Sequence, residues 1–321
     1  MTQQQAIRIL ENKFGHRLQP QADLRSFATA RVGGNAAWLV TVKNTLELAE
    51  VVQICWDNNL KFFVLGAGSN ILFNDEGFDG LVILNHAKKI EMNIAGENPT
   101  LWVESGANLG LVARKAALAG LSGLEWAGTI PGTVGGAIYG NAGAHDGDMH
   151  RNLLLAEILQ QKKGKSVWKN EDFQFKYRSS ILKRQQNSGI VLTATLKCHY
   201  DDPQMIKERM SSFSEHRRKT QPPGASMGSM FKNPAGDYAG RLIEAAGLKG
   251  YTVGGVKVSE MHANFFVNSD QATARDFFNL IQHVQKTVKK EFDVELELEV
   301  EMIGFDHIEE NKPASQEGTS Q

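Results

Sequence analysis

Apolar side chains recur at the spacing of an α-helix in several stretches of the sequence. Across residues 44–58 the apolar positions, which include Val51 and Cys55, fall on one helical face. Asn44 precedes them, where its side chain can cap the first turn, and Glu47 stands three residues further on. The same kind of pattern predicts further helices over residues 108–119, 203–219, 239–246 and 273–291.

Shorter apolar runs between these helices predict β-strands over residues 61–65, 80–84, 101–104 and 189–200. The last element alternates strictly from residue 294 to 302, with valine, leucine and methionine on one face. The opposite face carries Glu295, Glu297, Glu299 and Glu301. This alternation predicts a strand with one buried face and one wet or functional face.

The length of the chain indicates more than one lobe. Its 321 residues are too many for one compact core, because domains cluster at roughly 100–150 residues. We therefore expect two or three lobes with a cleft between them. The main boundary is expected near residue 200, where a strand pattern gives way to a charged helix. After Phe305 the sequence has too little apolar surface to fold.

Charge and cysteine content limit the possible partners. Lysine and arginine number 35 against 36 aspartates and glutamates, so no basic field is available for a nucleic-acid backbone. Cys55 and Cys198 are the only cysteines, which is typical of a reducing compartment. No signal-peptide pattern is present, and no apolar run approaches the ~18 residues that span a bilayer. We expect a cytoplasmic protein that binds neither nucleic acid nor membrane.

Two glycine-rich segments could place main-chain amides against an anion. The first, G-A-G-S-N at residues 66–70, follows a predicted strand. Ile71 occupies the third glycine position of a dinucleotide fingerprint and no helix pattern follows, so a Rossmann fold is not indicated. The second holds six glycines within residues 128–143. Close packing of backbones is one explanation; a cradle for a flat ring and a pyrophosphate is the other, and two such loops in one half favour it.

Two other kinds of site find no support in the sequence. Gly164, Lys165 and Ser166 mimic the end of a phosphate-binding P-loop, but Leu159 stands where its first glycine belongs. We interpret this segment as a hairpin turn. There is no H-E-x-x-H motif and no cluster of cysteine and histidine, so no metal site is expected.

Five motifs, in order, resemble those of the UDP-N-acetylenolpyruvoylglucosamine reductase (MurB) family. They lie at residues 66–70, 123–143, 177–180, 228–234 and 296–300. The resemblance covers nearly the whole chain except the first ~20 residues and the tail. Only 50 residues separate Arg178 from Ser229, too few for the inserted loop that carries a substrate-clamping tyrosine in one branch of the family. The chain therefore resembles the second, loop-less type.

The resemblance implies an α+β fold. It consists of a two-lobed FAD-binding domain of the vanillyl-alcohol-oxidase-like (PCMH) type and a C-terminal α+β substrate-binding domain. The expected divisions are an N-terminal helical segment at 1–22, an FAD-binding domain at 23–203 with lobes of about 23–86 and 87–203, a substrate-binding domain at 204–305, and a disordered tail at 306–321.

The resemblance also implies a cofactor and an activity. NADPH is expected to reduce a non-covalently bound FAD, which then reduces UDP-N-acetylglucosamine enolpyruvate to UDP-N-acetylmuramate for peptidoglycan synthesis and hence for cell-wall growth, shape and division. The FAD contacts are expected from Gly66, Ala67, Gly68, Ser69, Asn70, Ile130, Pro131, Gly132, Thr133, Gly135, Gly136, Asn141 and Gly143.

Reducing a vinyl ether conjugated to a carboxylate requires a hydride, a proton and a charge that holds the enolate. Arg178 can supply a bidentate cation, although an arginine in a Y-R-S sequence is usually a surface ion pair. The resemblance assigns the proton to Ser229, which by itself is a turn residue. Glu299 lies five residues before Gly304, as the family pattern requires, and is expected to help stabilise or protonate the intermediate opposite Arg178.

Four further side chains match family positions lining the nucleotide-sugar cleft, namely Tyr177, Lys232, Asn233 and His262. For His262 the match is weaker, because a histidine beside an apolar run is more often a satisfied core residue. Two departures stand out: Glu301 occupies a position where many members carry arginine, and His145 replaces a common aromatic residue. The first puts one substrate contact in doubt.

Two other functions remain open from the sequence. A flavin oxidase of the same fold would often tether its flavin through histidine or cysteine in the first loop, and residues 66–70 contain neither. A non-catalytic binding protein or scaffold would bind no flavin. We expect a monomeric enzyme that acts on a small-molecule substrate.

Overall fold

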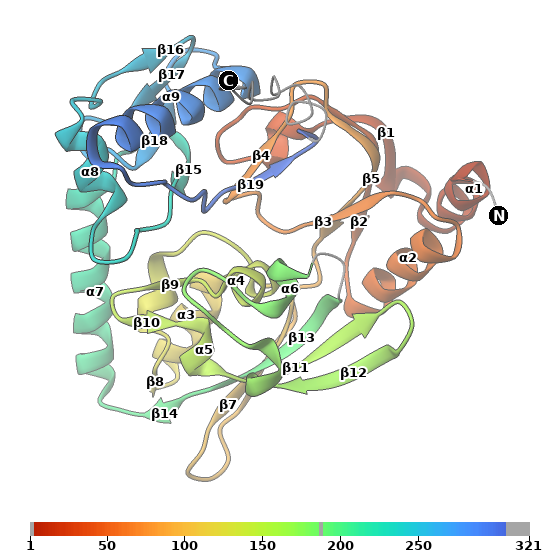
Figure 1. The fold of residues 1–321 in the computed structure, drawn as a ribbon. Coiled ribbons are helices and arrows are strands. Elements are labelled where there is room, and N and C mark those ends of the chain that lie inside the picture. The colour runs from red at the N-terminus through yellow and green to blue at the C-terminus, as the bar shows by residue number, and fades with distance from the viewer. Residues whose placement is uncertain (1–2, 186–188, 306–321) are drawn as a thin grey trace, which may run out of the picture.

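The computed structural model describes residues 3–185 and 189–305. The tail that we expected to be disordered lies outside this part of the chain. The described residues form three parts, each with its own sheet, as Figure 1 shows from red at the N-terminus to blue at the C-terminus.

The N-terminal part is a four-stranded sheet of order β1-β2-β5-β3. It comprises α1 (Gln3–Phe14), β1 (Leu18–Asp23), β2 (Asn35–Val42), α2 (Thr45–Asp57), β3 (Phe62–Leu65), β4 (Ile71–Phe73) and β5 (Phe78–Asn85), with short 3₁₀ turns at Gly15–Arg17 and Leu24–Phe27. Strands β2, β3 and β5 run parallel, whereas β1 is antiparallel to β2. The helix expected over 44–58 is confirmed as α2, because the side chain of Asn44 accepts from the amide of Glu47.

The middle part is an antiparallel sheet of order β12-β11-β13-β7-β6. Its strands are β6 (Ile90–Asn93), β7 (Thr100–Glu104), β11 (Leu153–Gln160), β12 (Gly164–Lys169) and β13 (Ile190–Lys197). Between them come α3 (Leu109–Leu118), β8 (Leu121–Ser122), a 3₁₀ helix η3 (Glu125–Thr129), α4 (Val134–Gly140), β9 (Gly143–Ala144), β10 (Gly147–Asp148), α5 (Met149–Asn152), η4 (Asn170–Phe173), α6 (Ile181–Arg184) and β14 (His199–Tyr200).

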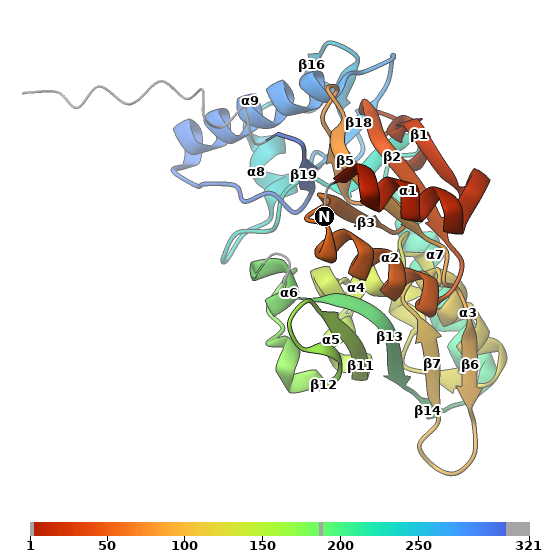
Figure 2. The ribbon, with the colours of Figure 1, turned by 90° about the vertical axis from the view of Figure 1, so that its right-hand side faces the viewer.

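Helix α2 joins the first two parts. Its buried residues Val51 and Cys55 share one core with Leu81 of β5 and with Leu159 and Leu192 of the middle sheet. In the view of Figure 2, α2 accordingly lies between the two sheets. The strands at 61–65, 80–84, 101–104 and 189–200 and the helix at 108–119 are confirmed within two or three residues.

The C-terminal part begins with α7 (Pro203–Thr220), which runs along one side of the molecule (Figure 1). The sheet that follows has the order β15-β18-β17-β16 and is formed by β15 (Ala225–Ser229), β16 (Thr252–Val253), β17 (Val256–Val258) and β18 (Phe265–Asn268). Helices α8 (Ala239–Ala245) and α9 (Ala274–Phe292) bury Leu242, Phe277 and Val284 in a shared core with this sheet. The helices expected at 203–219, 239–246 and 273–291 are therefore confirmed.

The strand expected over 294–302 is wrong for most of its length. Only β19 (Glu301–Ile303) is a strand, and it pairs parallel with β4 in the N-terminal part. Before it, the chain makes an isolated bridge at Leu298 with Phe231. The glutamate face also changes along the segment, because the side chain of Glu297 is 73% exposed and that of Glu299 is 21% exposed. The alternation marked an extended segment that passes from solvent into the interior.

The P-loop mimic lies at a hairpin, as expected, because Gly164 pairs with Gln160 where β11 turns into β12. Within residues 3–185 and 189–305, no helix combines the length and apolar character needed to cross a membrane.

Asp75 connects the N-terminal part to the C-terminal part. Its two carboxylate oxygens accept from the amides of Ala274 and Arg275, each over 2.8 Å, at the start of α9. These amides have no partner within the helix, and a carboxylate there also interacts favourably with the helix dipole. Thr273 and Asp276 form a capping box on the same turn.

We predict that Asp75→Ala lowers the free energy of unfolding by about 1 kcal/mol, as loss of a helix cap does. Urea denaturation followed by circular dichroism would measure it. Asp79→Ala is the matched control, because Asp79 is exposed and its carboxylate meets no donor in the described part of the chain. Equal midpoints for the two variants would show that Asp75 does not hold α9.

Candidate active site

A tight turn carries Arg178. The amide of Lys176 donates to the carbonyl of Ser179 over 2.8 Å, and the amide of Ser179 donates back over 3.1 Å. Arg178 has a φ of +51°, a left-handed conformation that strains any residue with a Cβ. The Ser180 hydroxyl anchors the end of the turn by donating to the carbonyl of Tyr139 over 2.7 Å. Such strain persists only where surrounding contacts enforce it. These hydrogen bonds therefore fix the direction in which the Arg178 side chain leaves the turn.

Arg178 forms an ion pair with Glu299. Its Nε lies 2.9 Å from Oε1 of Glu299, and the two side chains are 24% and 21% exposed. The Nε–H bond is buried but is not aligned on an acceptor within the described residues. The contact is therefore an ion pair without a well-formed hydrogen bond, and the guanidinium keeps hydrogen-bonding capacity for an anionic ligand.

Main-chain contacts hold Glu299 from two sides. Its amide donates to the carbonyl of Met230 over 2.9 Å, and two residues earlier Glu297 accepts from the amide of Lys232 over 2.8 Å. The carbonyl of Glu299 accepts a hydrogen bond from the side-chain Nδ2 of Asn70 over 2.9 Å. Glu299 is thus placed between the first glycine-rich loop and the segment that follows β15.

The environment of the Glu299 carboxyl raises its pKa above the ordinary value for glutamate. Burial is the main cause, and the positive charges of Arg178, Lys183 and Lys232 oppose it. A carboxyl with a raised pKa keeps its proton to higher pH than a surface glutamate does. The expectation of a carboxyl buried enough to hold a proton agrees with this direction.

Ser229 ends β15 at a bulge. The register with β18 shifts between Ser226 and Ser229, and Gly228 between them has a φ of +78° that suits glycine. The half-buried Ser229 hydroxyl has no hydrogen-bond partner among the described residues, so it is free to donate to a ligand. Because Met230 is bonded to Glu299, the fold brings all three expected catalytic residues to one region.

The two glycine-rich loops touch each other. The hydroxyl of Ser69 donates to the carbonyl of Pro131 over 3.1 Å. A Cβ on Gly66 would stand 2.5 Å from Oγ1 of Thr133, so a larger residue has no room there. Gly68 has a φ of +61°, and a Cβ on it would meet the carbonyl oxygen of Phe27 at 1.9 Å. Close approach of main chain to main chain is therefore one reason for these glycines.

The same loops present main-chain donors. Six main-chain amides in these loops donate no hydrogen bond to any of the described residues, namely those of Gly66, Ala67, Gly68, Ser69, Gly132 and Thr133. By contrast, Gly135 donates to the carbonyl of Ser105 over 2.8 Å and Gly136 donates to the Thr133 hydroxyl over 3.4 Å. Two adjoining loops with unpaired amides suit a pyrophosphate, so the residues present fit the FAD expected from the sequence.

Three other residues that we expected to contact the cofactor make structural contacts within the protein. Ile130 closes η3 by donating to the carbonyl of Ala127. Asn141 donates to the carbonyl of Lys176 over 3.0 Å and accepts from the amide of His150 over 3.0 Å, so it supports the Arg178 turn. A Cβ on Gly143 would be 3.2 Å from Nη1 of Arg178, so glycine lets the guanidinium lie close to this loop.

The four residues that we expected to contact the substrate lie in three places. Tyr177 lies on the Arg178 turn and is 54% exposed, with the guanidinium 5.3 Å from its ring centroid. Lys232 forms an ion pair with Glu297. Asn233 accepts from the amide of Ala239 at the start of α8. A Cβ on Gly240 in that helix would be 3.2 Å from Cε1 of His262, so Asn233 and His262 both lie at α8.

The contacts of His262 fit the bonded core histidine, one of the two roles that the sequence left open, while its contact with a nucleotide sugar stays a prediction. Its Nδ1 accepts from the amide of Asn264 over 3.2 Å, which places the ring proton of the neutral form on Nε2. Burial lowers the pKa of His262, so the neutral form prevails to lower pH than usual. His262 is thus a half-buried histidine that is bonded to its own chain.

Sequence reasoning missed two cations at the site. Lys183 of α6 lies 2.5 Å from Oε1 of Glu301 and donates to the carbonyl of Glu299 over 3.4 Å. Arg217 of α7 donates to the carbonyl of Thr129 beside the second glycine-rich loop. Burial lowers the pKa of Arg217. Neither residue belongs to a recognisable sequence pattern, because each reaches its partner in a distant segment through a long side chain.

His145 has an aromatic role of its own. Its ring stacks on Phe213 of α7 with centroids 4.1 Å apart and an interplanar angle of 6°. His145 and Asp146 form the two-residue turn between β9 and β10, and both have positive φ. His145 thus helps to pack α7 against the middle part of the molecule.

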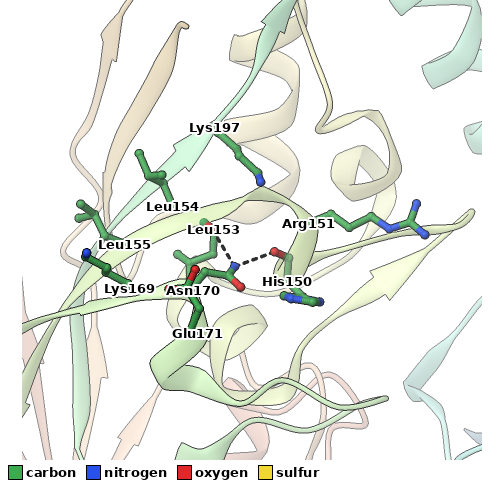
Figure 3. A pocket seen from close by; sticks show the side chains of 9 residues that line it. All are labelled: His150, Arg151, Leu153, Leu154, Leu155, Lys169, Asn170, Glu171 and Lys197. Atoms are coloured by element: carbon green, nitrogen blue, oxygen red, sulfur yellow. Dashed lines mark hydrogen bonds between the residues drawn. The ribbon is translucent and has the colours of Figure 1, made fainter.

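Two surface pockets lie apart from the Arg178–Glu299 pair. Figure 3 shows one of about 680 Å³ near β11, where Asn170 donates to the carbonyls of His150 and Leu153. The second, of about 670 Å³, borders Trp126 and His145. Neither is lined by Arg178, Ser229 or Glu299.

Comparison with known proteins identifies two domain families. The model of the UDP-N-acetylenolpyruvoylglucosamine reductase C-terminal domain matches residues 219–303, and that of the FAD binding domain matches residues 36–169. The UDP-N-acetylenolpyruvoylglucosamine reductase of Chloroflexus aggregans is 39% identical over 289 residues, which are 89% of this chain and 97% of the relative. That of Bacillus subtilis is 40% identical over 283 residues, or 88% and 92% of the two chains.

A solved structure agrees with these matches. The crystal structure of UDP-N-acetylenolpyruvylglucosamine reductase (MurB) from Thermus caldophilus superposes with a TM-score of 0.75 at 36% identity, covering 89% of this chain and 98% of that one. The expected fold class, a PCMH-type FAD-binding domain followed by a C-terminal α+β domain, is thereby confirmed. The chain therefore belongs to the UDP-N-acetylenolpyruvoylglucosamine reductase family and is an FAD-dependent oxidoreductase.

Proposed function

We propose that this enzyme uses NADPH to reduce UDP-N-acetylglucosamine enolpyruvate to UDP-N-acetylmuramate, and that Arg178, Ser229 and Glu299 act on the substrate. The observation that supports this most directly is the Arg178–Glu299 ion pair at 2.9 Å, held next to a serine with a free hydroxyl. An enolpyruvyl ether needs a fixed cation and a proton donor at one place, and this cluster offers both.

FAD binding is assigned to the two touching glycine-rich loops. Their unpaired amides at Gly66–Ser69 and at Gly132 and Thr133 are donors for the pyrophosphate. When bound, the flavin supplies the hydride chemistry that no amino-acid side chain provides. Asn70 links this cradle to the reaction centre, because its side chain holds the main chain of Glu299.

Arg178 is assigned to the substrate carboxylate. Its guanidinium is permanently charged, and its planar donors match the two carboxylate oxygens. As negative charge develops on the substrate during reduction, a cation in a half-buried place stabilises it more strongly than one in water would. Glu299 keeps Arg178 in place before the substrate arrives, and its raised pKa allows it to share a proton with the intermediate.

Ser229 is assigned as the proton donor to the carbon next to the carboxylate. Its hydroxyl is not committed to any acceptor within the described residues, and the bulge at Gly228 sets its direction. The four residues Tyr177, Lys232, Asn233 and His262 are assigned to the nucleotide-sugar portion. Lys232 is the cation among them, and its partner Glu297 is exposed and easily displaced by a diphosphate.

A covalently tethered flavin is the less favoured alternative. The thiols of Cys55 and Cys198 have pKa values raised to about 12 by burial, so neither is a reactive thiolate. The first loop contains no histidine or cysteine. Retention of FAD is therefore assigned to non-covalent contacts.

The wider assignments follow from the same site. We assign residues 23–203 to FAD binding and 204–305 to substrate binding. Because one chain supplies Arg178, Ser229 and Glu299 together, the enzyme is proposed to act as a monomer. Two free cysteines suit a reducing compartment, so the cytoplasm is the proposed location.

We predict that Ala67→Asp weakens FAD binding by about 100-fold, whereas Ala67→Asn retains most of the flavin. Ala67 is exposed in the first loop, so either side chain fits, and only aspartate adds a negative charge beside the pyrophosphate. A unit charge about 5 Å away at an effective dielectric constant of about 20 costs about 3 kcal/mol. Flavin absorbance per protein after gel filtration measures the loss. Equal flavin content in the two variants would remove the loop from the cofactor site.

We predict that Ser229→Ala slows reoxidation of the prereduced enzyme by enolpyruvyl substrate by about 10²- to 10⁴-fold. Reduction of the flavin by NADPH should keep its wild-type rate, because no proton moves to carbon in that step. Ser229→Cys should recover part of the lost rate, since a thiol can still donate. Single-turnover stopped-flow absorbance separates the two half-reactions. A Ser229→Ala rate within a few-fold of wild type would leave Glu299 as the candidate donor.

A further inference from the structure

Lys183 lies among the charges of the reaction centre without a role in the scheme above. It belongs to the short helix α6, five residues after Arg178. Its ammonium group is 2.5 Å from Oε1 of Glu301, and the two side chains are 17% and 24% exposed. The same ammonium donates to the carbonyl of Glu299 over 3.4 Å.

These contacts arrange four charges of alternating sign. Arg178 and Lys183 come from one segment of the middle part, and Glu299 and Glu301 come from the segment at the start of β19. The two ion pairs show that both glutamates face these cations, although the chain bends at Val300 between them. Half-buried charges are costly to leave unpaired. The two ion pairs therefore fix the position of residues 299–301 against the middle part of the molecule.

The two ion pairs are not equivalent. Arg178–Glu299 is the pair that the substrate carboxylate enters, whereas Lys183 reaches the main chain of Glu299 and gives its salt bridge to Glu301. We propose that Lys183 is a positioning residue for Glu299, and that Glu301 controls it by competing for its ammonium group. The inference rests on the proposed role of Glu299 in substrate reduction.

The charges that face Glu299 determine the direction in which each substitution should shift its pKa. Burial raises the pKa of Glu299, and Arg178, Lys183 and Lys232 lower it. Lys232 is already paired with the exposed Glu297. Two further groups lie beyond these cations: Glu301 of β19, and Tyr139 of α4, whose pKa is raised by burial and next by Glu301, so that it stays neutral. Lys183 and Lys232 are therefore the cations whose influence on Glu299 a second carboxylate can adjust, and of their two partners Glu301 is half-buried whereas Glu297 is exposed.

Removing the positive charge of Lys183 should move the titration of Glu299 to higher pH, because one of the groups that favour the carboxylate is lost. Removing the negative charge of Glu301 should move it to lower pH, because the ammonium group is released toward Glu299. A merely structural role predicts no such opposition. Lys183→Arg keeps the charge and should leave the titration nearly unchanged.

The experiment measures the titration in two ways for Lys183→Met, Lys183→Arg, Glu301→Gln and the double variant Lys183→Met/Glu301→Gln. The first is the pH profile of single-turnover flavin reoxidation by enolpyruvyl substrate. The second is the carbon-13 chemical shift of the Glu299 carboxyl in oxidised holoenzyme without substrate, assigned with Glu299→Gln. The double variant leaves no unpaired charge, so it folds even where a single variant does not.

We expect the Glu299 titration to move up in Lys183→Met and down in Glu301→Gln. If Glu301 acts through Lys183, adding Glu301→Gln to Lys183→Met should leave the titration where Lys183→Met put it. The same downward movement in both backgrounds would show direct action of Glu301 and overturn the competition. An unchanged titration in Lys183→Met would overturn the positioning role.

The two readouts also separate this inference from the proposed function. If carbon-13 titrations move as expected while reoxidation shows no Glu299-dependent limb, the network is present but Glu299 does not act in substrate reduction. If the reoxidation profile moves while the carboxyl titration does not, Lys183 affects catalysis by another route and the inference fails.

Discussion

The position of Glu299 is the constraint on which the rest of the site depends. This one residue is bonded to all three parts of the molecule: through its carbonyl to Asn70, through its amide to Met230 and through its carboxylate to Arg178. Each contact lies far from the others in sequence, so it forms only when the parts have packed. Parallel pairing of β19 with β4, visible near the centre of Figure 1, sets the register that delivers Glu299 to this point.

The charges around Glu299 explain why the site is built from such distant segments. Burial of the Glu299 carboxyl raises its pKa and so disfavours its charged form. Arg178 opposes this effect, but its own backbone is strained at a φ of +51° and is retained by the bonds of Lys176 and Ser179 and by Asn141. The strained turn, the ion pair and the raised pKa are parts of one arrangement in which charge is available before a substrate binds.

Sequence patterns predicted the parts of this arrangement better than their connections. The cap of α2 followed from Asn44, because a cap is a contact over three residues. Motif resemblance brought Arg178, Ser229 and Glu299 forward as candidates. The strand over 294–302 was wrong, since alternation records burial on one side and not the presence of a hydrogen-bonded neighbour. Lys183 and Arg217 were missed because their partners are reached across the fold by long side chains.

The glycines of the cradle show how one loop can serve packing and binding at once. At Gly68 a side chain is excluded by the Phe27 carbonyl, and at Gly66 by the Thr133 side chain of the second loop, so these residues are glycine because of contacts within the protein. Yet the close packing of Gly66 on Thr133 accompanies the contact between Ser69 and Pro131, and the amides of both loops are left without an acceptor among the described residues. A residue with a Cβ at Gly66 would press on Thr133 and separate the two loops before it touched any ligand. The glycine pattern is therefore a requirement of the fold that also prepares the cofactor site.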